Sequence, residues 1–347
     1  MNGWRSLAWT VTAIGLGFAV GGVLVAAFGH DPWLALTMML SGAFGSSFDF
    51  ATTLASSIPL ALTGLAVALA FQAGLFNIGA SGQFWLGAIA ATWVGYSLPL
   101  PALVHPVVAL LAAMLAGALW AAVIPGLAKV HRGAHEVITT LMLTYIAVEL
   151  GHFLLEKGPM MTPGFNPESP KILESAHLPT LVSGTQLSAG LLLVPLCAGV
   201  GWLLLFRTPL GFGLRMTGHN PRAARYAGVS PTAATLLALA LSGAFAGLAG
   251  GILILGVEHR LHNSFDVSYG FTGIVVALLA RNHPIGVIPA ALLFGALDNG
   301  AQAMQIFAEI PANLTEVIKG SIIFFVAAEG LGRWLFERRT RLEGVGA

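Results

Sequence analysis

Long apolar stretches recur along the whole chain, and shorter polar segments separate them. A helix needs about 20 apolar residues to cross the hydrocarbon core of a bilayer. Ten stretches stand out, and the eighth is too short to cross, which predicts a half-helix or part of a bent helix. They are residues 7–28, 51–71, 75–98, 102–127, 136–155, 188–206, 233–256, 271–281, 285–305 and 317–336. The pattern predicts an all-α polytopic membrane protein with about ten transmembrane helices.

The polar segments between these stretches differ in character. Residues 33–48 are semi-polar and are expected at the outer surface, residues 157–187 are rich in proline, and residues 207–232 are rich in arginine. The first apolar run, residues 7–28, is longer than the roughly 7–15 residues of a signal-peptide core. It is therefore interpreted as a retained membrane helix.

Composition supports a membrane protein and argues against a soluble enzyme. Hydrophobic residues make up 56% of the 347, and charged residues only 9%, against roughly 25% in soluble domains. The single cysteine, Cys197, excludes an intrachain disulfide and a cysteine metal cluster.

The basic residues orient the chain. If the N-terminus starts inside, 12 of the 16 Lys and Arg residues fall on the inner side. The positive-inside rule then predicts cytoplasmic termini at both ends and an even number of crossings. The outer side keeps Lys157, Lys171, Arg260 and Lys319.

A short internal similarity suggests a duplication of two halves. Residues 60–64 (LALTG) resemble residues 239–243 (LALSG), and each opens a block of four or five spans. Duplications of this kind are common in transporters, although chance similarity is the alternative in a chain so rich in Leu, Ala and Gly.

A polar, glycine-rich motif interrupts the apolar pattern at residues 74–83. Polar groups at membrane depth are tolerated where they are buried in protein or face a water-filled cavity. The motif predicts either a discontinuous helix beside a translocation pathway or a tight glycine crossing tied together by amides. Its candidate pathway residues are Phe76, Asn77, Ser81 and Gln83.

The arginine-rich segment encodes a short helix outside the membrane. Asn220 is a favourable N-cap, Pro221 suits the first helical position, and Gly228 is a natural stop. The helix is expected either to dock on a cytoplasmic partner or to rest on anionic lipid. The candidate docking residues are Asn220, Pro221, Arg222, Ala223, Ala224, Arg225, Tyr226 and Gly228.

Two further polar residues, Asp298 and Asn299, fall well inside an apolar span. A carboxylate there is disfavoured by roughly 2.5–3.5 kcal/mol on insertion scales. Asp298 is therefore a candidate for the translocation pathway, with a structural polar contact as the alternative.

Motifs for chemistry on this chain are missing. The sequence holds no Gly-x-x-x-x-Gly-Lys-Ser/Thr, no His-Glu-x-x-His and no Gly-x-Ser-x-Gly. We therefore expect no catalytic residue, no metal site and no cofactor, and any ATP hydrolysis on another chain.

Four segments together resemble a known family. They are residues 76–83 (FNIGASGQ), 133–143 (GAHEVITTLML), 211–228 and 269–279 (YGFTGIVVALL). Matching in this order, they are similar to the inner-membrane permeases of bacterial ABC importers for nucleosides, within the wider group of ribose, simple-sugar and branched-chain amino-acid permeases. One departure is Ser81, which stands where family members usually carry Glu.

The resemblance implies the rest of a transport machine. Residues 1–347 would form one transmembrane permease domain in the inner membrane, with a cytoplasmic coupling loop at 207–232 and an extracytoplasmic loop at 157–187. The implied partners are a second permease subunit, a separate ABC ATPase, an extracytoplasmic substrate-binding protein and the lipid bilayer, with no nucleic-acid polymer. Nucleosides are the expected substrates; simple sugars such as ribose, and ion-coupled secondary transport, remain the alternatives.

Overall fold

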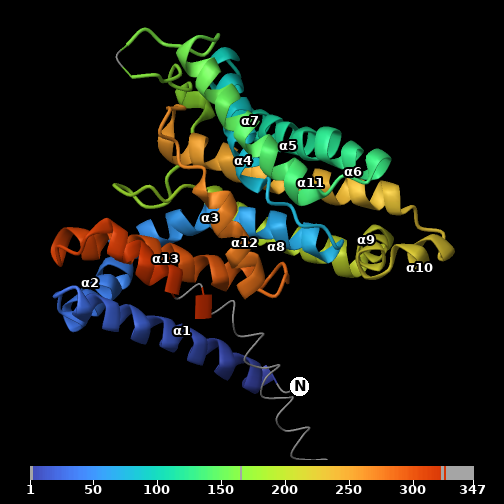
Figure 1. Cartoon of the computed structure of the whole chain (residues 1–347). Helices are drawn as coiled ribbons and strands as arrows, with labels where there is room; N and C mark the ends of the chain where they lie inside the picture. Colours follow the sequence, from blue (N-terminus) through green and yellow to red (C-terminus); the bar gives the residue numbers. More distant parts are fainter. Residues whose placement is uncertain (1–2, 165, 322–323, 326–347) are drawn as a thin grey trace, which may run out of the picture. The chain divides into compact units, whose positions relative to one another are not determined.

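The computed structural model describes residues 3–164, 166–321 and 324–325, with side chains described from residue 12 onward. Regular structure in these residues is helical apart from two isolated β-bridges. The helices are α1 (Gly3–Ala27), α2 (Pro32–Phe44), α3 (Ser47–Gln72), α4 (Ala80–Ser97), α5 (His105–Ala121), α6 (Leu127–Arg132), α7 (Glu136–Glu156), α8 (Gly190–Arg207), α9 (Pro209–His219), α10 (Pro221–Tyr226), α11 (Pro231–Leu253), α12 (Ser268–Leu279) and α13 (Val287–Phe307) (Figure 1). Two π-helical segments, Ala122–Gly126 and Ile254–Glu258, extend α5 and α11, a 3-10 turn spans Glu174–Ala176, and a further helical stretch covers residues 312–321.

The chain divides into two compact units. Unit 1 combines the part up to Phe50 with the part from Ala296, and unit 2 is Ala51–Gly295. Unit 2 contains the polar motif at 74–83, the arginine-rich segment and α12.

Five helical stretches among the described residues are long and apolar enough to cross a membrane. They are Ser47–Gln72, His105–Arg132, Glu136–Glu156, Gly190–Arg207 and Pro231–Glu258. The all-α membrane fold is therefore confirmed, while the total of ten crossings stays a prediction. Residues 33–48, expected only as a surface segment, overlap most of the apolar helix α2. Of the predicted span 317–336, residues 322–323 and 326–336 lie outside the described part.

Glycines let three helices of unit 2 approach backbone to backbone. A Cβ added to Gly87 of α4 would lie 2.2 Å from the carbonyl oxygen of Gly247 in α11. One added to Gly117 of α5 would lie 2.1 Å from the carbonyl oxygen of Gly243, again in α11. Lipid tails are as apolar as leucine, so helix association in a membrane depends on close packing of this kind. The α4–α5–α11 crossing is therefore the packing centre of unit 2.

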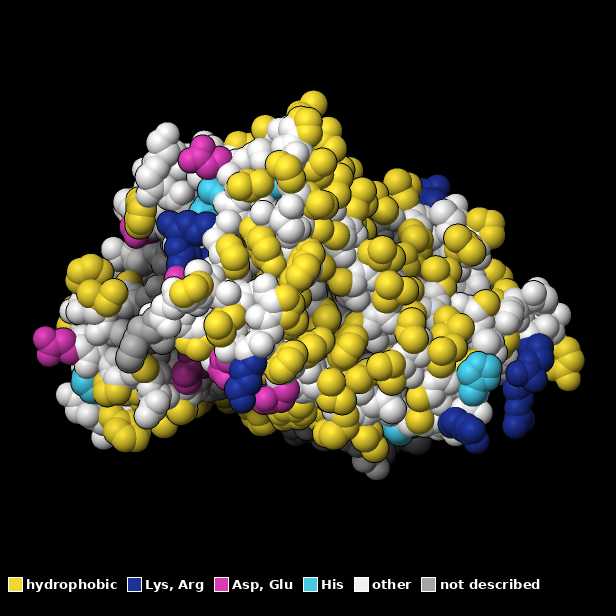
Figure 2. All heavy atoms as spheres, turned by 90° about the horizontal axis from the view of Figure 1, so that it is seen from above, with side chains coloured by type: hydrophobic (Ala, Val, Ile, Leu, Met, Phe, Trp, Pro, Cys, Tyr) yellow, Lys and Arg dark blue, Asp and Glu magenta, His cyan; other side chains and the backbone are white. Residues whose placement is uncertain are grey.

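Basic side chains gather at one end of unit 2, which we call the basic end. Lysine and arginine side chains cluster at the right of Figure 2, and α6, α9 and α10 lie at the right of Figure 1, whereas hydrophobic side chains cover much of the visible surface. The residues that define this end are Lys129, Arg132, Arg207, Arg215, Arg222, Arg225 and Arg281.

The segment between α7 and α8 is bonded to the turn that follows α11, at the opposite end of unit 2. Backbone amides of Ser169 and Ile172 donate to the carbonyl oxygens of Leu261 and His259 at 2.8 and 3.0 Å. Arg260 also forms an ion pair with Glu168. The proline-rich segment is thus attached to unit 2 by specific bonds.

Candidate functional site

The polar motif before α4 ties this helix to α11. Asn77 is fully buried. Its Nδ2 donates to Gln83 Oε1 at 2.8 Å and to Ser242 Oγ at 2.9 Å, and its Oδ1 accepts from Gln83 Nε2 at 3.0 Å. Phe76 is half-buried and meets Phe71 edge to face, with 4.8 Å between ring centroids. These contacts give the motif a packing role within the chain, and its approach to a pathway stays a prediction.

Ser81 is the second residue of α4 and lies at a contact with α12. It is fully buried, and its hydroxyl has no hydrogen-bond partner among the residues that the structure describes. A Cβ added to Gly270 would lie 2.4 Å from Ser81 Oγ. Only a small residue at 270 allows the first turns of the two helices to touch in this way.

The two similar pentapeptides, residues 60–64 and 239–243, make equivalent contacts with other helices. Ser242 of α11 accepts from Asn77, just before α4. Thr63 of α3 donates to the carbonyl oxygen of Tyr269 at 3.0 Å, at the start of α12. The hydroxyl of each pentapeptide therefore hydrogen-bonds to the start of a helix in the other half: Ser242 to the segment before α4, and Thr63 to the first turn of α12. This equivalent placement supports the predicted duplication.

We expect the primary effect of Asn77→Leu to be a lower stability of the folded chain, and not a direct effect on transport. The change leaves the Gln83 amide and the Ser242 hydroxyl buried without their partner, and each unsatisfied group costs about 1–3 kcal/mol. Thermal unfolding in detergent should show a clearly lower midpoint than for Asn166→Leu, a matched change at an exposed asparagine. Equal midpoints would contradict the packing role.

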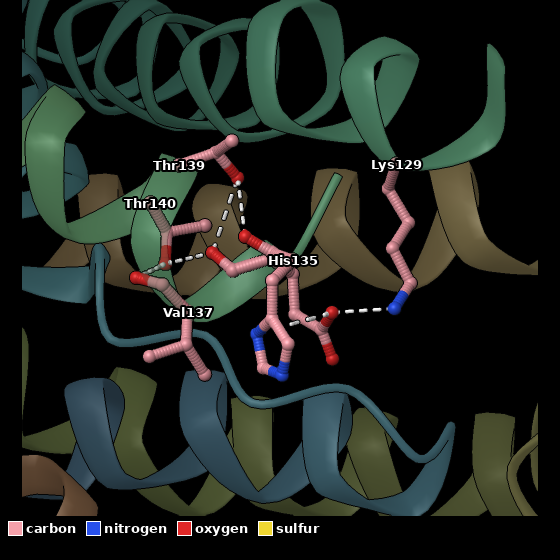
Figure 3. A network of polar contacts seen from close by, with 6 residues as sticks. Lys129, His135, Val137, Thr139 and Thr140 are labelled. Carbon is pink, nitrogen blue, oxygen red and sulfur yellow. Dashed lines mark hydrogen bonds and ion pairs between the residues drawn. The ribbon is translucent and has the colours of Figure 1, made fainter. Parts of the chain in front are cut away.

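An ion pair fixes the turn between α6 and α7 at the basic end. Lys129 Nζ lies 2.5 Å from Glu136 Oε2, and the Glu136 side chain is only 8% exposed. Gly133 makes the turn with a φ of 64°. Thr140 Oγ1 donates to the Glu136 carbonyl oxygen at 2.7 Å (Figure 3). The segment 133–143 singled out in the sequence therefore sets the angle at which α7 leaves this end.

Helices α9 and α10 form a capped pair at the basic end. Asn220 Oδ1 accepts from the backbone amides of Arg222 and Ala223 at 3.0 and 3.2 Å. Gly228 has a φ of 81° and is followed by α11. The predicted cap, first-turn proline and stop therefore lie where the sequence placed them, although the helical turn itself ends at Tyr226.

The two faces of α10 differ sharply. Ala224 is fully buried in the chain, whereas Tyr226 is 95% exposed. Arg222 and Arg225 are exposed as well, and Pro221 with them. Ala224 therefore packs inward, and the surface that α10 offers to a partner consists of the arginines and the tyrosine.

The two polar residues of α13 lie in unit 1, where both are engaged. Asp298 Oδ1 accepts from Lys319 Nζ at 3.1 Å, and Lys319 also contacts Glu316 at 2.6 Å. Asn299 Nδ2 donates to the carbonyl oxygens of Gly42 and Asp49 at 2.7 and 3.0 Å. The partner of Asp298, Lys319, is separated from it by 21 residues.

Sequence reasoning missed the segment that leads into α12. Phe265 is buried; it stacks on Phe84 and packs at a tilt against Trp85, with centroid distances of 5.5 and 5.2 Å. Asp266 and Ser268, its neighbours, are exposed. The available signal was an aspartate just before an apolar stretch too short to cross a bilayer. In the described residues, no group of three or more His, Cys, Asp or Glu side chains is placed to hold a metal ion.

Comparison with known proteins gives a consistent match over most of the chain. The family model described as the permease component of branched-chain amino acid transport systems matches residues 49–327. The glucose ABC transporter permease protein TsgB13 of Haloferax volcanii is 38% identical, covering 93% of this chain and 87% of the relative. The guanosine ABC transporter permease protein NupP of Bacillus subtilis is 36% identical, covering 91% of each chain.

Two further matches complete the comparison. The nucleoside ABC transporter permease protein NupB of Lactococcus lactis is 34% identical, covering 94% of this chain and 92% of the relative. A solved ABC transporter of the metal-chelate type, in an inward-facing conformation, aligns over 94% of this chain and 98% of its own with a TM-score of 0.40 and 16% identity.

Proposed function

Because the chain belongs to the family of permease components of branched-chain amino acid transport systems, we propose that it forms the membrane pathway of an ABC importer for nucleosides. The observation that supports this substrate class is the near full-length similarity to two permeases of guanosine and nucleoside transporters, at 36% and 34% identity. As a permease subunit, the chain is a transport component and not an enzyme.

The proposed machine has four kinds of component. A second permease subunit would complete the pathway, and a separate ABC ATPase would supply the energy. A substrate-binding protein would deliver the solute to the end of unit 2 that carries the proline-rich segment. The protein would lie in the bacterial inner membrane. Its basic end and both termini would face the cytoplasm, as the positive-inside rule requires.

The exposed surface of α10 supports docking of the ATPase at the basic end. A helix of six residues is far too short to persist alone in water, so Asn220 and the packing of Ala224 hold it against the chain. It would move as a rigid unit with α9 and α11, which it joins. Force on Arg222, Arg225 or Tyr226 would therefore pass into the spans.

A glucose-type sugar is the second candidate substrate. The permease of a glucose transporter is 38% identical to this chain, and glucose, like the ribose of a nucleoside, presents adjacent hydroxyl groups that can hydrogen-bond in a polar pathway. The two substrates differ in the nucleobase, which offers a flat surface for stacking on aromatic side chains.

Uptake by the reconstituted complex tests the proposal. The permease, its second permease subunit and its ATPase are placed in proteoliposomes with the binding protein, and labelled guanosine uptake is followed with and without ATP. We expect ATP-dependent uptake that excess unlabelled adenosine reduces and excess glucose does not. Uptake of glucose alone would replace the substrate class, and uptake driven by an ion gradient without ATP would contradict the mechanism.

A further inference from the structure

Helix α12 begins near the middle of the membrane-spanning layer. The carbonyl oxygen of Tyr269, in its first turn, accepts from Thr63 of α3. Thr63 lies about 24 Å from the first residue of α3 and about 14 Å from its last, at 1.5 Å per residue. The chain before α12 therefore crosses the outer half of this layer as non-helical backbone.

A second contact places this backbone independently. Asn263 Nδ2 donates to Glu156 Oε1, at the last residue of α7, at 2.9 Å. Phe265 then packs on Trp85. The indole of Trp85 lies against Gly151, because a Cβ added there would come within 2.0 Å of Trp85 Nε1. Gly151 is about 8 Å along α7 from Glu156, so the chain descends into the membrane layer from residue 263 onward.

One side of this descending segment is packed and the other is exposed. Leu261 and Phe265 are buried. Ser264, Asp266 and Ser268 are exposed. Non-helical backbone at membrane depth is tolerated only where it is buried in protein or lines a water-filled cavity. An exposed carboxylate at this depth is likewise disfavoured against lipid, so this side faces either water or a second subunit of the complex.

The carboxylate of Asp266 is held in a defined orientation. Its Oδ1 accepts from the backbone amide of Ser268 at 2.7 Å, and its Oδ2 accepts from Ser268 Oγ at 2.8 Å. The two oxygens of a carboxylate offer about four acceptor positions, so positions remain that can accept hydrogen bonds from a ligand. Phe271, three residues after Ser268 and therefore on the same face of α12, is 40% exposed.

We propose that Asp266, positioned by Ser268, binds the neighbouring hydroxyl groups of a ribose ring in the translocation pathway, with Phe271 as the apolar surface beside it. This inference rests on the proposed function and assigns a subsite within it. A carboxylate accepts from two adjacent hydroxyls at once, and ion-assisted hydrogen bonds are about twice as strong as neutral ones. The subsite therefore selects for a sugar that keeps both hydroxyls.

The first test compares two substrates in two complexes. Uptake of guanosine and of 2′,3′-dideoxyguanosine is measured for the complete importer with the wild-type chain and with Asp266→Ala, using the same binding protein. For each complex, the preference is the uptake of guanosine divided by that of the dideoxy analogue. Because the binding protein is the same in both complexes, a difference between the two preferences comes from the permease. We expect Asp266→Ala to lose about tenfold in guanosine uptake and to lose most of the preference for guanosine.

Controls separate this outcome from loss of folding or of the proposed function. Glu149→Gln, which neutralises an exposed carboxylate on α7, should transport as the wild type does. An unchanged preference in a well-assembled Asp266→Ala complex overturns the subsite. Absence of guanosine uptake by the wild-type complex instead overturns the nucleoside proposal.

Thiol labelling tests the subsite without reference to transport. In a Cys197→Ser background, Ser264→Cys and Ser268→Cys should react with a membrane-impermeant methanethiosulfonate, and guanosine should slow the reaction at position 268. Ser242→Cys is the matched control, because Ser242 is fully buried and should stay unlabelled. If positions 264 and 268 react no faster than position 242, lipid or protein covers this face and the proposal is wrong.

Discussion

Replacing Gly117 with alanine is expected to lower the unfolding midpoint of the chain strongly, and replacing it with leucine to abolish folded protein in the membrane. A Cβ at this position would lie 2.1 Å from the carbonyl oxygen of Gly243 and 3.0 Å from the Cα of Gly247. Both atoms belong to the backbone of α11, so α5 and α11 must move apart. Overpacking of this kind costs about 1–3 kcal/mol or more, which is a large part of a typical net stability of about 5–15 kcal/mol.

The same substitution elsewhere in unit 2 supplies the control. Gly199 lies inside α8, and a Cβ added there would meet no atom within 4 Å. Gly199→Ala should therefore be neutral or raise stability by about 0.5–1 kcal/mol through helix propensity. Fluorescence-detected size exclusion after a heating series measures both variants. A shared midpoint for Gly117→Ala and Gly199→Ala would mean that the helices tolerate separation, contrary to the packing proposed for them.

Local signals were readable from the sequence because they depend on neighbouring residues only. The cap at Asn220 and the turn at Gly228 are fixed by bonds to residues at most a few positions away. The apolar run 136–155 predicted α7 almost residue for residue. Length alone also marked 271–281 as unable to cross, and α12 is a 12-residue helix.

Hydrogen-bond and ion-pair partners that lie far apart in the chain could not be predicted from the sequence. These partners determine whether a polar residue has a packing role. Asn77 and Ser242 are separated by 165 residues, so the sequence alone left packing and pathway readings of the motif about even. Asp298 finds Lys319 only through the fold of unit 1. The orientation of α10 was hidden for the same reason, since a six-residue helix carries too little periodicity to show that Ala224 faces inward.

That orientation changes which residue tests the coupling of α10 to an ATPase. A charge at Ala224 would disturb the packing of this chain itself, because Ala224 is fully buried. Tyr226 is the sharper choice, since it is 95% exposed and its removal leaves the cap at Asn220 intact. Tyrosine and arginine are the residue types enriched at the energetic centres of protein interfaces, and Tyr226 follows Arg222 and Arg225 on α10.

Tyr226→Ala is expected to weaken ATPase binding by about 30-fold, which corresponds to about 2 kcal/mol at an interface hot spot. Substrate-stimulated ATP hydrolysis and uptake should fall with it, while the amount of folded permease stays the same. Co-purification of the ATPase, titrated against its concentration, measures the affinity. Tyr145→Ala is the matched control, because Tyr145 is 61% exposed on α7, away from α10.

The charges of α10 distinguish a protein partner from a lipid surface. If α10 docks on an ATPase, Arg222→Gln and Arg225→Gln should lower ATPase affinity equally in vesicles with and without anionic lipid, and Arg132→Gln, at an exposed arginine of the same basic end, should not. If α10 rests on lipid, the arginine variants should matter only where anionic lipid is present, and Tyr226→Ala should leave ATP hydrolysis unchanged. That second pattern would remove α10 from the coupling pathway and leave the α6–α7 turn, fixed by Lys129 and Glu136, as the next surface of the basic end to test.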